Sequence, residues 1–287
     1  MIKYNEFCKC VSEIAVKALL FEVSATPKPG LVDRYNSGAH GDMDFYTFMS
    51  SSAALGHTFY QCALAAGKYE EVNYDNILAY IRPIGIEGEK RMLKATGGVN
   101  THKGLIFSLG IIAAVAGMAY IESPRTNIDS LEICSRVISV TKGISQKELV
   151  QNKKKKEFTY GEYLYKKYGV KGIRGEVESG FATVREYGLP ILISLMKNRN
   201  LNDVLVQVLL HLMMYTEDSN VLGRHDLSTL DYVKINAKQA LSLGGIFTAE
   251  GRKKVMDMDK DFIEKNISPG GAADLLAVTL MLYFLGS

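Results

Sequence analysis

The sequence contains two polar segments whose residue types could bind a phosphorylated substrate. The first reads TPKPGLVDRYNSGAHGDMD over residues 26–44. Each proline in it fixes its own φ and restricts the preceding residue, so Lys28 is expected at a rigid turn. The second reads TGGVNTHKG over residues 96–104. Its Gly97 and Gly98 allow a ligand to approach the backbone closely, and the helix expected to follow offers free N–H groups to an anion.

Carboxylates occur at two places where a helix end does not favour them. Glu22 falls in the last expected turn of the first helix, and Glu217 and Asp218 follow another apolar helix. Negative charge opposes the dipole of a helix C-terminus at a cost of about 0.3 to 1 kcal/mol, so a compensating cation is expected. For Glu22 this cation could be Lys28 or Arg34 in a structural network, or a bound metal ion.

The first segment also carries a row of possible metal ligands. His40, Asp42 and Asp44 lie two residues apart, and clustered oxygen ligands suit Mg²⁺ that is held together with substrate phosphates. One of the two aspartates could instead cap the helix that follows, because aspartate is a preferred N-cap residue. In the second segment, Asn100 or Thr101 could likewise do no more than cap a helix.

Two later segments carry more charge than packing requires. Residues 169–180 read GVKGIRGEVESG, in which Arg174 could hold a phosphate at two points and Glu176 could act as a base or a metal ligand. Residues 216–226 read TEDSNVLGRHD and could bind a metal ion, a ribose and a phosphate. The side chains available there include those of Asn220, Arg224 and His225.

Two further features have simple structural explanations. The sequence SPGGAAD at residues 268–274 is a glycine-rich helix start, and an aspartate is favourable near a helix N-terminus, so Asp274 can be structural. The basic run at residues 153–156 has no interleaved aromatic or glycine residue. We interpret this run as a solvated loop rather than a phosphate-binding patch.

The stretches between these segments are expected to be helices. In the first stretch, apolar residues recur at alternating spacings of four and three, which places them on one helical face; they are Phe7, Val11, Ile14, Ala18 and Phe21. Further helical patterns cover residues 44–66, 74–93, 101–120, 129–141, 177–187, 203–215, 230–243 and 271–284. No convincing series of alternating strands occurs. We predict an all-α fold, a single compact domain over residues 1–287 with a polar site formed by the loops between helices.

One apolar stretch tests whether the chain enters a membrane. Residues 104–121 carry no charge, and their length is at the lower edge of a membrane span. Their many glycine and alanine residues suit close packing among other helices, so a buried central helix and no membrane partner are expected.

Composition limits the possible classes of protein further. The 287 residues are 47% hydrophobic and 23% charged, which excludes a disordered or collagen-like chain. A net charge of +3 gives no indication of a nucleic-acid partner. The four cysteines form no CxxC pair, and the N-terminal residues lack the apolar run of a signal peptide. A cytoplasmic location is therefore predicted.

Taken together, the polar segments resemble the triphosphoribosyl-dephospho-CoA synthase family, which makes the precursor of the citrate lyase prosthetic group and includes a malonate decarboxylase counterpart. The matching segments follow family order over nearly the whole chain. They are EVS at 22–24, TPKPGLVD at 26–33, GAH at 38–40, DMD at 42–44, TGGVNTHKG at 96–104, GIRGE at 172–176, EDSN at 217–220 with Arg224, and PGGAADLL at 269–276.

The resemblance implies a reaction between ATP and dephospho-CoA. A ribose hydroxyl of dephospho-CoA attacks the anomeric carbon of the ATP ribose, adenine leaves, and the triphosphate is retained. Cleavage of such an N-glycosidic bond has oxocarbenium character and calls for a base, help for the leaving group and nearby negative charge. The resemblance also implies a stand-alone synthase whose product passes to a separate carrier-protein transferase. The pathway served and the oligomeric state stay open.

On this hypothesis the candidate residues fall into three groups. The base is Asp33, His102 or Glu176, and the sequence does not distinguish them. Mg²⁺ is expected among Glu22, Asp42, Asp44 and Asp218. The expected substrate-binding residues are Lys28, Gly30, Arg34, Gly97, Gly98, Asn100, Thr101, Lys103, Arg174, Asn220, Arg224, Gly270 and Gly271.

Two other classes of function fit the residues. An all-α, Mg²⁺-dependent hydrolase of nucleotides or ADP-ribose-like N-glycosides would use the same carboxylates with water as the nucleophile. A helical adaptor would leave the polar loops merely solvated, but the carboxylates at helix C-termini argue against it.

Overall fold

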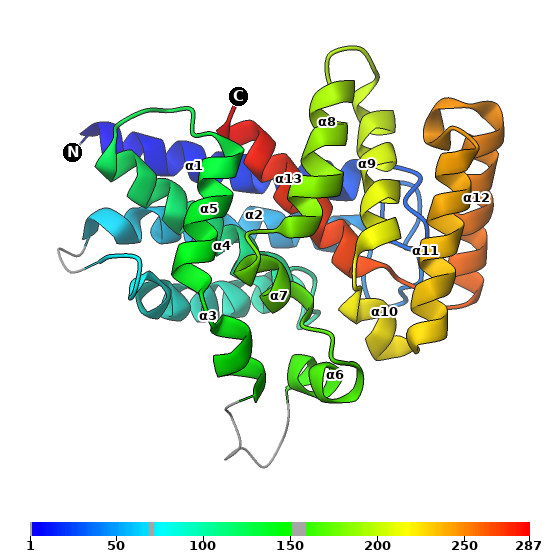
Figure 1. The fold of residues 1–287 in the computed structure, drawn as a ribbon, viewed down its shortest axis with the longest axis horizontal. Helices are drawn as coiled ribbons and strands as arrows, with labels where there is room; N and C mark the ends of the chain where they lie inside the picture. The colour runs from blue at the N-terminus through cyan, green and yellow to red at the C-terminus, as the bar shows by residue number, and fades with distance from the viewer. Residues whose placement is uncertain (1, 69–71, 151–158) are drawn as a thin grey trace. The chain divides into compact units, whose positions relative to one another are not determined.

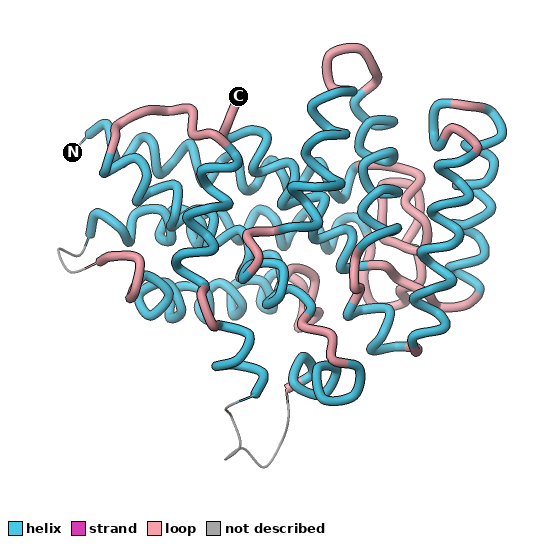
Figure 2. Tube along the Cα trace, in the orientation of Figure 1, coloured by secondary structure: helices cyan, strands magenta, loops and turns pink. Residues whose placement is uncertain are grey.

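Helices are the only regular elements in the part of the chain that the computed structural model describes, which is residues 2–68, 72–150 and 159–287 (Figure 1). Figure 2 shows these helices joined by loops and turns. The all-α class expected from the sequence is therefore confirmed. The basic run at residues 153–156 lies outside the described residues.

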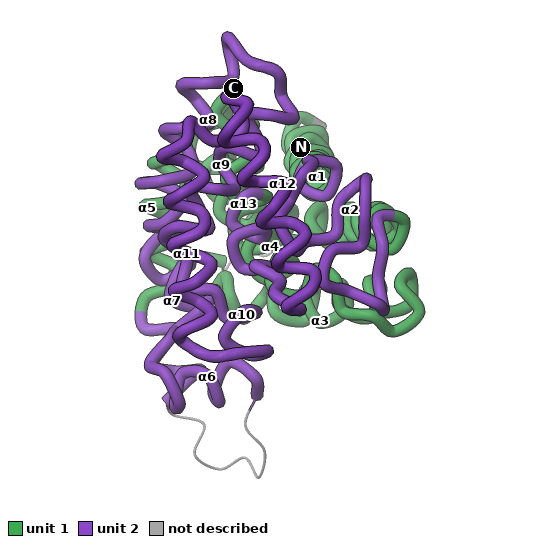
Figure 3. The backbone as a smooth tube through the Cα atoms, turned by 90° about the vertical axis from the view of Figure 1, so that its right-hand side faces the viewer, with its two compact units in different colours: residues 1–21, 46–142, 277–287 green, residues 22–45, 143–276 purple. Residues whose placement is uncertain are grey.

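The helices form two compact units, coloured separately in Figure 3. Unit 1 comprises Met1–Phe21, Tyr46–Lys142 and Ala277–Ser287, and unit 2 comprises Glu22–Phe45 and Gly143–Leu276. The boundaries fall within α1 (Ile2–Ser24) and α13 (Gly270–Leu285), near the start of α2 (Phe45–Lys68), and between α5 and the next element. The single domain predicted for residues 1–287 stays a prediction.

Unit 1 is built around the apolar helix α4. This unit contains most of α2, together with α3 (Ile77–Ala95), α4 (Lys103–Glu122) and α5 (Ser130–Thr141), and α4 packs against both α3 and α5. By length and composition alone α4 could cross a membrane, but 78% of its apolar window is buried within the protein. The buried helix expected over residues 104–121 is thus present.

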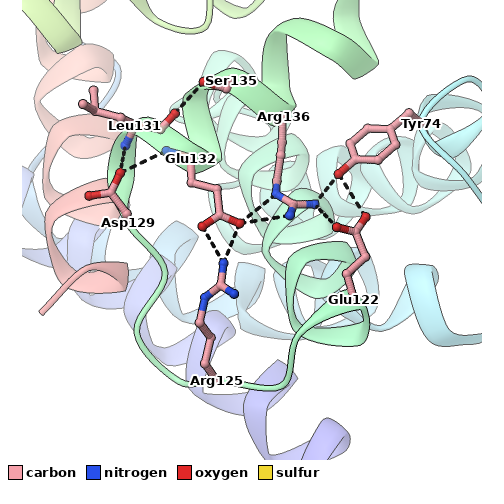
Figure 4. A network of polar contacts seen from close by, with 8 residues as sticks. All are labelled: Tyr74, Glu122, Arg125, Asp129, Leu131, Glu132, Ser135 and Arg136. Atoms are coloured by element: carbon pink, nitrogen blue, oxygen red, sulfur yellow. Dashed lines mark hydrogen bonds and ion pairs between the residues drawn. The ribbon is translucent and has the colours of Figure 1, made fainter.

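A network of charged side chains holds the carboxyl end of α4 to α5 (Figure 4). The Arg136 guanidinium lies 2.7 Å from Glu122 and 3.0 Å from Glu132. It also donates to the Tyr74 hydroxyl, and Arg125 pairs with Glu132 from the other side. Because each carboxylate has a cation and the residues are partly exposed, this network serves to fix the α4–α5 connection.

Unit 2 collects the remaining helices. They are α6 (Tyr160–Tyr168), α7 (Gly172–Glu178), α8 (Leu189–Leu195), α9 (Leu201–Tyr215), α10 (Ser219–Arg224), α11 (Leu227–Ser242) and α12 (Ala249–Glu264), with single turns at Gln146–Val150, Val184–Gly188 and Gly245–Phe247. Figure 1 shows α9, α11 and α12 side by side, and α11 packs against both of the others.

Several parts of unit 2 differ from the sequence predictions, which included neither α6 nor α8. The expected loops at residues 169–180 and 216–226 contain the short helices α7 and α10, and the helix expected over 177–187 is replaced by the end of α7 and a separate turn. Helix α12 was not predicted, because its charged residues hide the apolar spacing. The residues that carry this spacing, all buried, are Val255, Met258 and Phe262.

Close packing of α4 gives a stability prediction. A Cβ at Gly117 would lie 2.2 Å from the carbonyl oxygen of Ala63, whereas a Cβ at Gly110 would first meet Cys62 Sγ at 3.4 Å. We expect Gly117→Ala to lower the free energy of unfolding by about 1 to 3 kcal/mol through overpacking. The matched variant Gly110→Ala, on the same helix, should be neutral or stabilising by up to about 1 kcal/mol. Urea unfolding checks both, and equal effects would contradict the prediction.

Candidate functional site

A buried ion pair opens the first polar segment of unit 2. Glu22 lies in the last turn of α1, and the Lys28 ammonium group donates a hydrogen bond to its Oε1. Both residues are buried, at 2% and 1% relative exposure. Burial raises the pKa of Glu22, and the charge of Lys28 opposes that rise. Lys28 is therefore the compensating cation for Glu22, and its side chain points to this carboxylate rather than outward to a phosphate.

Asp33, one of the three candidate bases, organises the backbone around it. It is buried, and its oxygens accept the N–H groups of Lys28 at 3.1 Å, Tyr35 at 2.7 Å and Asn36 at 3.0 Å. A carboxylate has about four lone-pair sites, so three backbone donors leave little room for a proton from a substrate. This geometry favours a structural role for Asp33.

A third buried carboxylate, Asp259 on α12, holds the backbone of this segment. It accepts the N–H of Gly30 at 3.0 Å and the side-chain amide of Asn36 at 2.9 Å. Gly30 has φ +70°, and a Cβ there would lie 2.2 Å from the Ile267 carbonyl oxygen. Gly30 was expected to bind a substrate, but the group that approaches it closely is the protein's own backbone. Sequence reasoning missed Asp259 because it missed α12.

Asp218 caps α10 and also holds the start of α13. Its Oδ1 accepts the N–H groups of Asn220 at 2.9 Å and Val221 at 3.2 Å, and its Oδ2 accepts that of Ala272 at 2.9 Å. Burial raises the pKa of Asp218, and these donors, with the N–H of Gly271, lower it. Asp218 was expected to bind a metal ion because it follows the end of α9. It also begins the short helix α10, and backbone N–H groups occupy its carboxylate.

The glycines before α13 have the same explanation. A Cβ at Gly271 would lie 2.9 Å from the Asp218 carboxylate carbon, and a Cβ at Gly270 would lie 2.9 Å from the Asn220 side-chain nitrogen. Gly270 and Gly271, which were expected to bind a substrate, therefore make room for Asn220 and Asp218 in this structure.

Asp274, also in this region, differs from these carboxylates: no described residue donates a hydrogen bond to it. It lies on α13 and stays partly exposed. Burial, then the carboxylates of Glu22 and Asp218, raise its pKa well above the usual range, and Lys28 lowers it. These carboxylates thus act on one another within unit 2. The sequence analysis explained Asp274 as structural, although it belongs to the PGGAADLL segment.

Glu176, the second candidate base, lies on α7. Its Oε1 accepts the Thr183 hydroxyl at 2.6 Å, and its Oε2 is buried with no hydrogen-bond partner within the described residues. Burial raises the pKa of Glu176; Thr183 opposes the rise and Glu217 adds to it. A carboxyl group with a raised pKa and an open oxygen is suited to general acid–base chemistry.

The five predicted phosphate-binding cations differ in their partners. Three are paired with carboxylates: Lys28 with Glu22, Arg174 with Glu148 at 2.8 Å, and Lys103 of unit 1 with Glu89 at 2.9 Å. Arg34 donates to the Asn202 amide oxygen at 3.1 Å, and Arg224 donates to the Ala39 carbonyl at 3.2 Å and to His40 Nδ1 at 3.2 Å. Because these acceptors are neutral, none of them offsets the positive charges of Arg34 and Arg224.

Two of the predicted metal ligands lie at the surface. Asp42 has a side chain 65% exposed, 3.7 Å from His40 Nδ1, and Asp44 immediately precedes α2. Burial, then the charge of Arg224, lower the pKa of His40. Among the described residues, no three His, Cys, Asp or Glu side chains are grouped closely enough to hold a metal ion. The Mg²⁺ site among Glu22, Asp42, Asp44 and Asp218 stays a prediction.

In unit 1, the second polar segment forms an exposed turn between α3 and α4. Gly97 and Gly98 have φ +65° and +97°, and a Cβ at either would meet no atom within 4 Å. Both glycines are required by the backbone conformation and leave the turn open to a ligand. Asn100 Oδ1 accepts the Lys103 N–H at 3.2 Å, so Asn100 also supports the helix start.

The histidine of this segment faces the protein interior. His102 is 1% exposed, and its Nδ1 lies 2.6 Å from Ser51 Oγ and 3.4 Å from Thr101 Oγ1. Thr101 donates to Ser51 at 2.8 Å, and the His102 N–H donates to Met92 Sδ at 3.2 Å. These contacts attach the turn to α2 and α3, so His102 and Thr101 have structural roles beside those predicted.

Arginines with neutral acceptors and a buried acid with an open oxygen, held on loops and short helices, indicate an all-α enzyme for phosphorylated substrates. The chain belongs to the ATP:dephospho-CoA triphosphoribosyl transferase family, whose model matches residues 8–287. This membership confirms the family resemblance and the transferase activity inferred from it, and it decides against the hydrolase and adaptor alternatives.

The sequence of this chain aligns with those of curated relatives over most of their lengths. The chain is 40% identical over 279 residues to a 2-(5''-triphosphoribosyl)-3'-dephosphocoenzyme-A synthase of Escherichia fergusonii, with 96% of this chain and 90% of the relative covered. It is 39% identical over 267 residues to the synthase of Klebsiella pneumoniae, covering 93% and 87%. A probable synthase of Streptococcus pyogenes is 37% identical over 285 residues, covering 96% of both chains. No solved structure matches significantly.

Packing at α13 predicts that Gly271 is a stability residue. Gly271→Ala places a Cβ against the Asp218 carboxylate, so we expect a loss of about 1 to 3 kcal/mol in the free energy of unfolding without any ligand. Gly41, where a Cβ would meet nothing within 4 Å, is the matched control. Thermal unfolding in buffer with a chelator checks this, and unchanged stability of Gly271→Ala would instead favour a purely ligand-binding glycine.

The raised pKa of Glu176 gives a pH-dependent prediction. Since the folded-state pKa lies above that of the unfolded chain, the stability this group contributes is full at acidic pH and is lost as the pH rises. Glu176→Gln stays neutral, so it should be more stable than the parent at pH 7 and equal to it at pH 4. Urea unfolding at both values is the measurement. Glu178→Gln, on the same helix and paired with Lys171, is the control and should show no such gain.

Proposed function

We propose that Arg34 and Arg224 of unit 2 bind the triphosphate of ATP, so that the chain can transfer the triphosphoribosyl group to dephospho-CoA. The observation that carries the proposal is the difference in partners: these two of the five expected cations donate only to neutral acceptors. Arginine can hold a phosphate at two points, and an uncompensated charge is available to do so. Both side chains are connected to the first polar segment. Arg34 belongs to it, and Arg224 donates hydrogen bonds to Ala39 and His40 within it.

Glu176 is proposed as the base. It takes the proton from the attacking hydroxyl of dephospho-CoA while the new C–O bond forms at the anomeric carbon, the C–N bond breaks, and adenine leaves with the bonding electrons. Its unpaired Oε2 and raised pKa support this role. Asp33 is less suited because backbone donors occupy its oxygens.

Carboxylates of unit 2 are proposed to stabilise the positive charge that develops on the ribose. Asp274 is the central one, because it lacks a hydrogen bond from the described residues and lies near Glu22 and Asp218. Positive charge developing beside it would favour its ionised form against the burial that raises its pKa. Its oxygens also fit Mg²⁺, which is commonly held by one or two carboxylates together with substrate phosphates. When bound there, Mg²⁺ would neutralise charge on the triphosphate. Glu22 and Asp218 would then contribute negative charge near the metal ion without coordinating it.

A role in substrate binding is also proposed for residues of unit 1. In unit 1, the exposed turn with Gly97, Gly98, Asn100 and Lys103 is proposed to meet a phosphorylated part of a substrate. The product would be the prosthetic-group precursor of citrate lyase or malonate decarboxylase, passed in the cytoplasm to a separate carrier-protein transferase.

The direct test is to incubate the purified chain with ATP, dephospho-CoA and Mg²⁺ and to analyse the products by mass spectrometry. Free adenine together with the joined triphosphoribosyl product supports the proposal. Adenine or ADP-ribose-type products formed without dephospho-CoA would indicate an N-glycoside hydrolase instead.

Charge removal at the two arginines gives the quantitative prediction. Arg224→Ala and Arg34→Ala should each raise the KM for ATP by about 10- to 100-fold, since a hydrogen bond to a charged group contributes about 1.5 to 3 kcal/mol. The control is Arg252→Ala, which removes an exposed arginine already paired with Asp203 at 2.8 Å and should change KM by less than about fivefold. Steady-state kinetics with varied ATP makes the comparison, and equal KM values for all three variants would refute the assignment.

A further inference from the structure

Three segments of unit 2 that are distant in sequence meet around the guanidinium of Arg224. Its Nη1 donates to the Ala39 carbonyl at 3.2 Å and, at 3.5 Å, to Asn266 Oδ1, and its Nη2 donates to His40 Nδ1 at 3.2 Å. Guanidinium has five N–H donors. The three contacts therefore leave Nε–H and one Nη2–H, which belong to adjacent nitrogens and can hold a phosphate at two points.

The contact with Arg224 determines the protonation of His40. Arginine can only donate, so His40 Nδ1 must be the acceptor, and the proton of the neutral ring is on Nε2. His40 Nε2 lies 2.9 Å from the hydroxyl of Ser268, a residue only 3% exposed. His40 therefore donates to Ser268 and accepts from Arg224, and the two contacts fix the orientation of its ring.

We propose that His40, held by Ser268, is a positioning residue that orients Arg224 for the triphosphate of ATP. From the sequence, His40 was considered only as a possible metal ligand, and Ser268 was given no role in binding. The inference rests on the proposed role of Arg224 in ATP binding. It adds an explanation of how the Arg224 side chain is held in place. Helix α10, on which Arg224 lies, is only six residues long.

Neighbouring contacts show why a histidine suits this position. A carboxylate in place of Nδ1 would pair with Arg224 and cancel the charge that a phosphate needs, whereas neutral imidazole holds the guanidinium and leaves its charge unchanged. Asn266, another acceptor of Arg224, is also fixed in position. Its carbonyl oxygen lies 2.9 Å from His225 Nε2, and its backbone has φ +56°. The acceptors of Arg224 thus come from a fixed frame.

The test compares two variants that share a shape. His40→Asn keeps an acceptor, its Oδ1, at the place of Nδ1, whereas His40→Leu has similar branching and no acceptor. We expect His40→Leu to raise the KM for ATP about tenfold with kcat within about twofold of the parent, and His40→Asn to restore KM to within about threefold. His57→Leu, at an exposed histidine of unit 1, is the matched control and should leave KM unchanged.

The outcomes separate this inference from the proposed function. If Arg224→Ala raises KM but His40→Leu and His40→Asn behave alike, the positioning role of His40 is wrong and the role of Arg224 stands. If Arg224→Ala leaves KM unchanged, the proposed triphosphate site itself fails. Should His40→Leu not fold, Ser268→Ala provides the second measurement: a rise in KM for ATP of at least about threefold, at unchanged kcat, supports the inference, and an unchanged KM overturns it.

Discussion

The desolvation of carboxylates is the constraint on which the polar region of unit 2 depends. An ionised carboxylate is costly to bury unless cations or hydrogen-bond donors surround it. Unit 2 buries Glu22, Asp33, Asp218 and Asp259, and each has such partners. Lys28 serves the first, and backbone N–H groups or an amide serve the others. The loops fold as they do because their donors must reach these carboxylates.

This constraint separates the residues that build the site from those that can act in it. Carboxylates with complete sets of donors are occupied, and cations paired with carboxylates are neutralised. Among the candidate residues that the structure describes, the exceptions are an acid with an open oxygen (Glu176), a partly exposed aspartate (Asp274), and two arginines with neutral acceptors (Arg34 and Arg224). Family membership establishes the reaction class, and the distribution of hydrogen-bond and ion-pair partners supports the roles proposed for individual residues.

Much of the fold could be predicted from the sequence because it depends on local spacing. The apolar run of α4 and the alternating spacing in α1 each identified a helix within a few residues of its observed bounds. Charged residues concealed α12, and glycines concealed α7 and α10. Short helices add few periods to a pattern, so only tertiary contacts reveal them.

The site was harder to predict because the direction of a side chain depends on distant partners. A turn does begin at Lys28, whose carbonyl accepts the N–H of Leu31, but only the position of Glu22 shows that the ammonium group turns inward. Asp218 was expected to bind a metal because it follows a helix end, and no local pattern indicated that Ala272 would donate to it. Candidates were therefore identified by type, while occupied and available groups were distinguished only in three dimensions.

The hydrogen bond between Gly30 and Asp259 also bears on how the chain is made. Its two residues are 229 positions apart, and synthesis proceeds at about 5 to 20 residues per second. The first polar segment therefore leaves the ribosome on the order of ten seconds or more before the carboxylate that fixes its backbone exists. During translation, this part of the nascent chain has no native partner from α12 until nearly the whole protein has been synthesised.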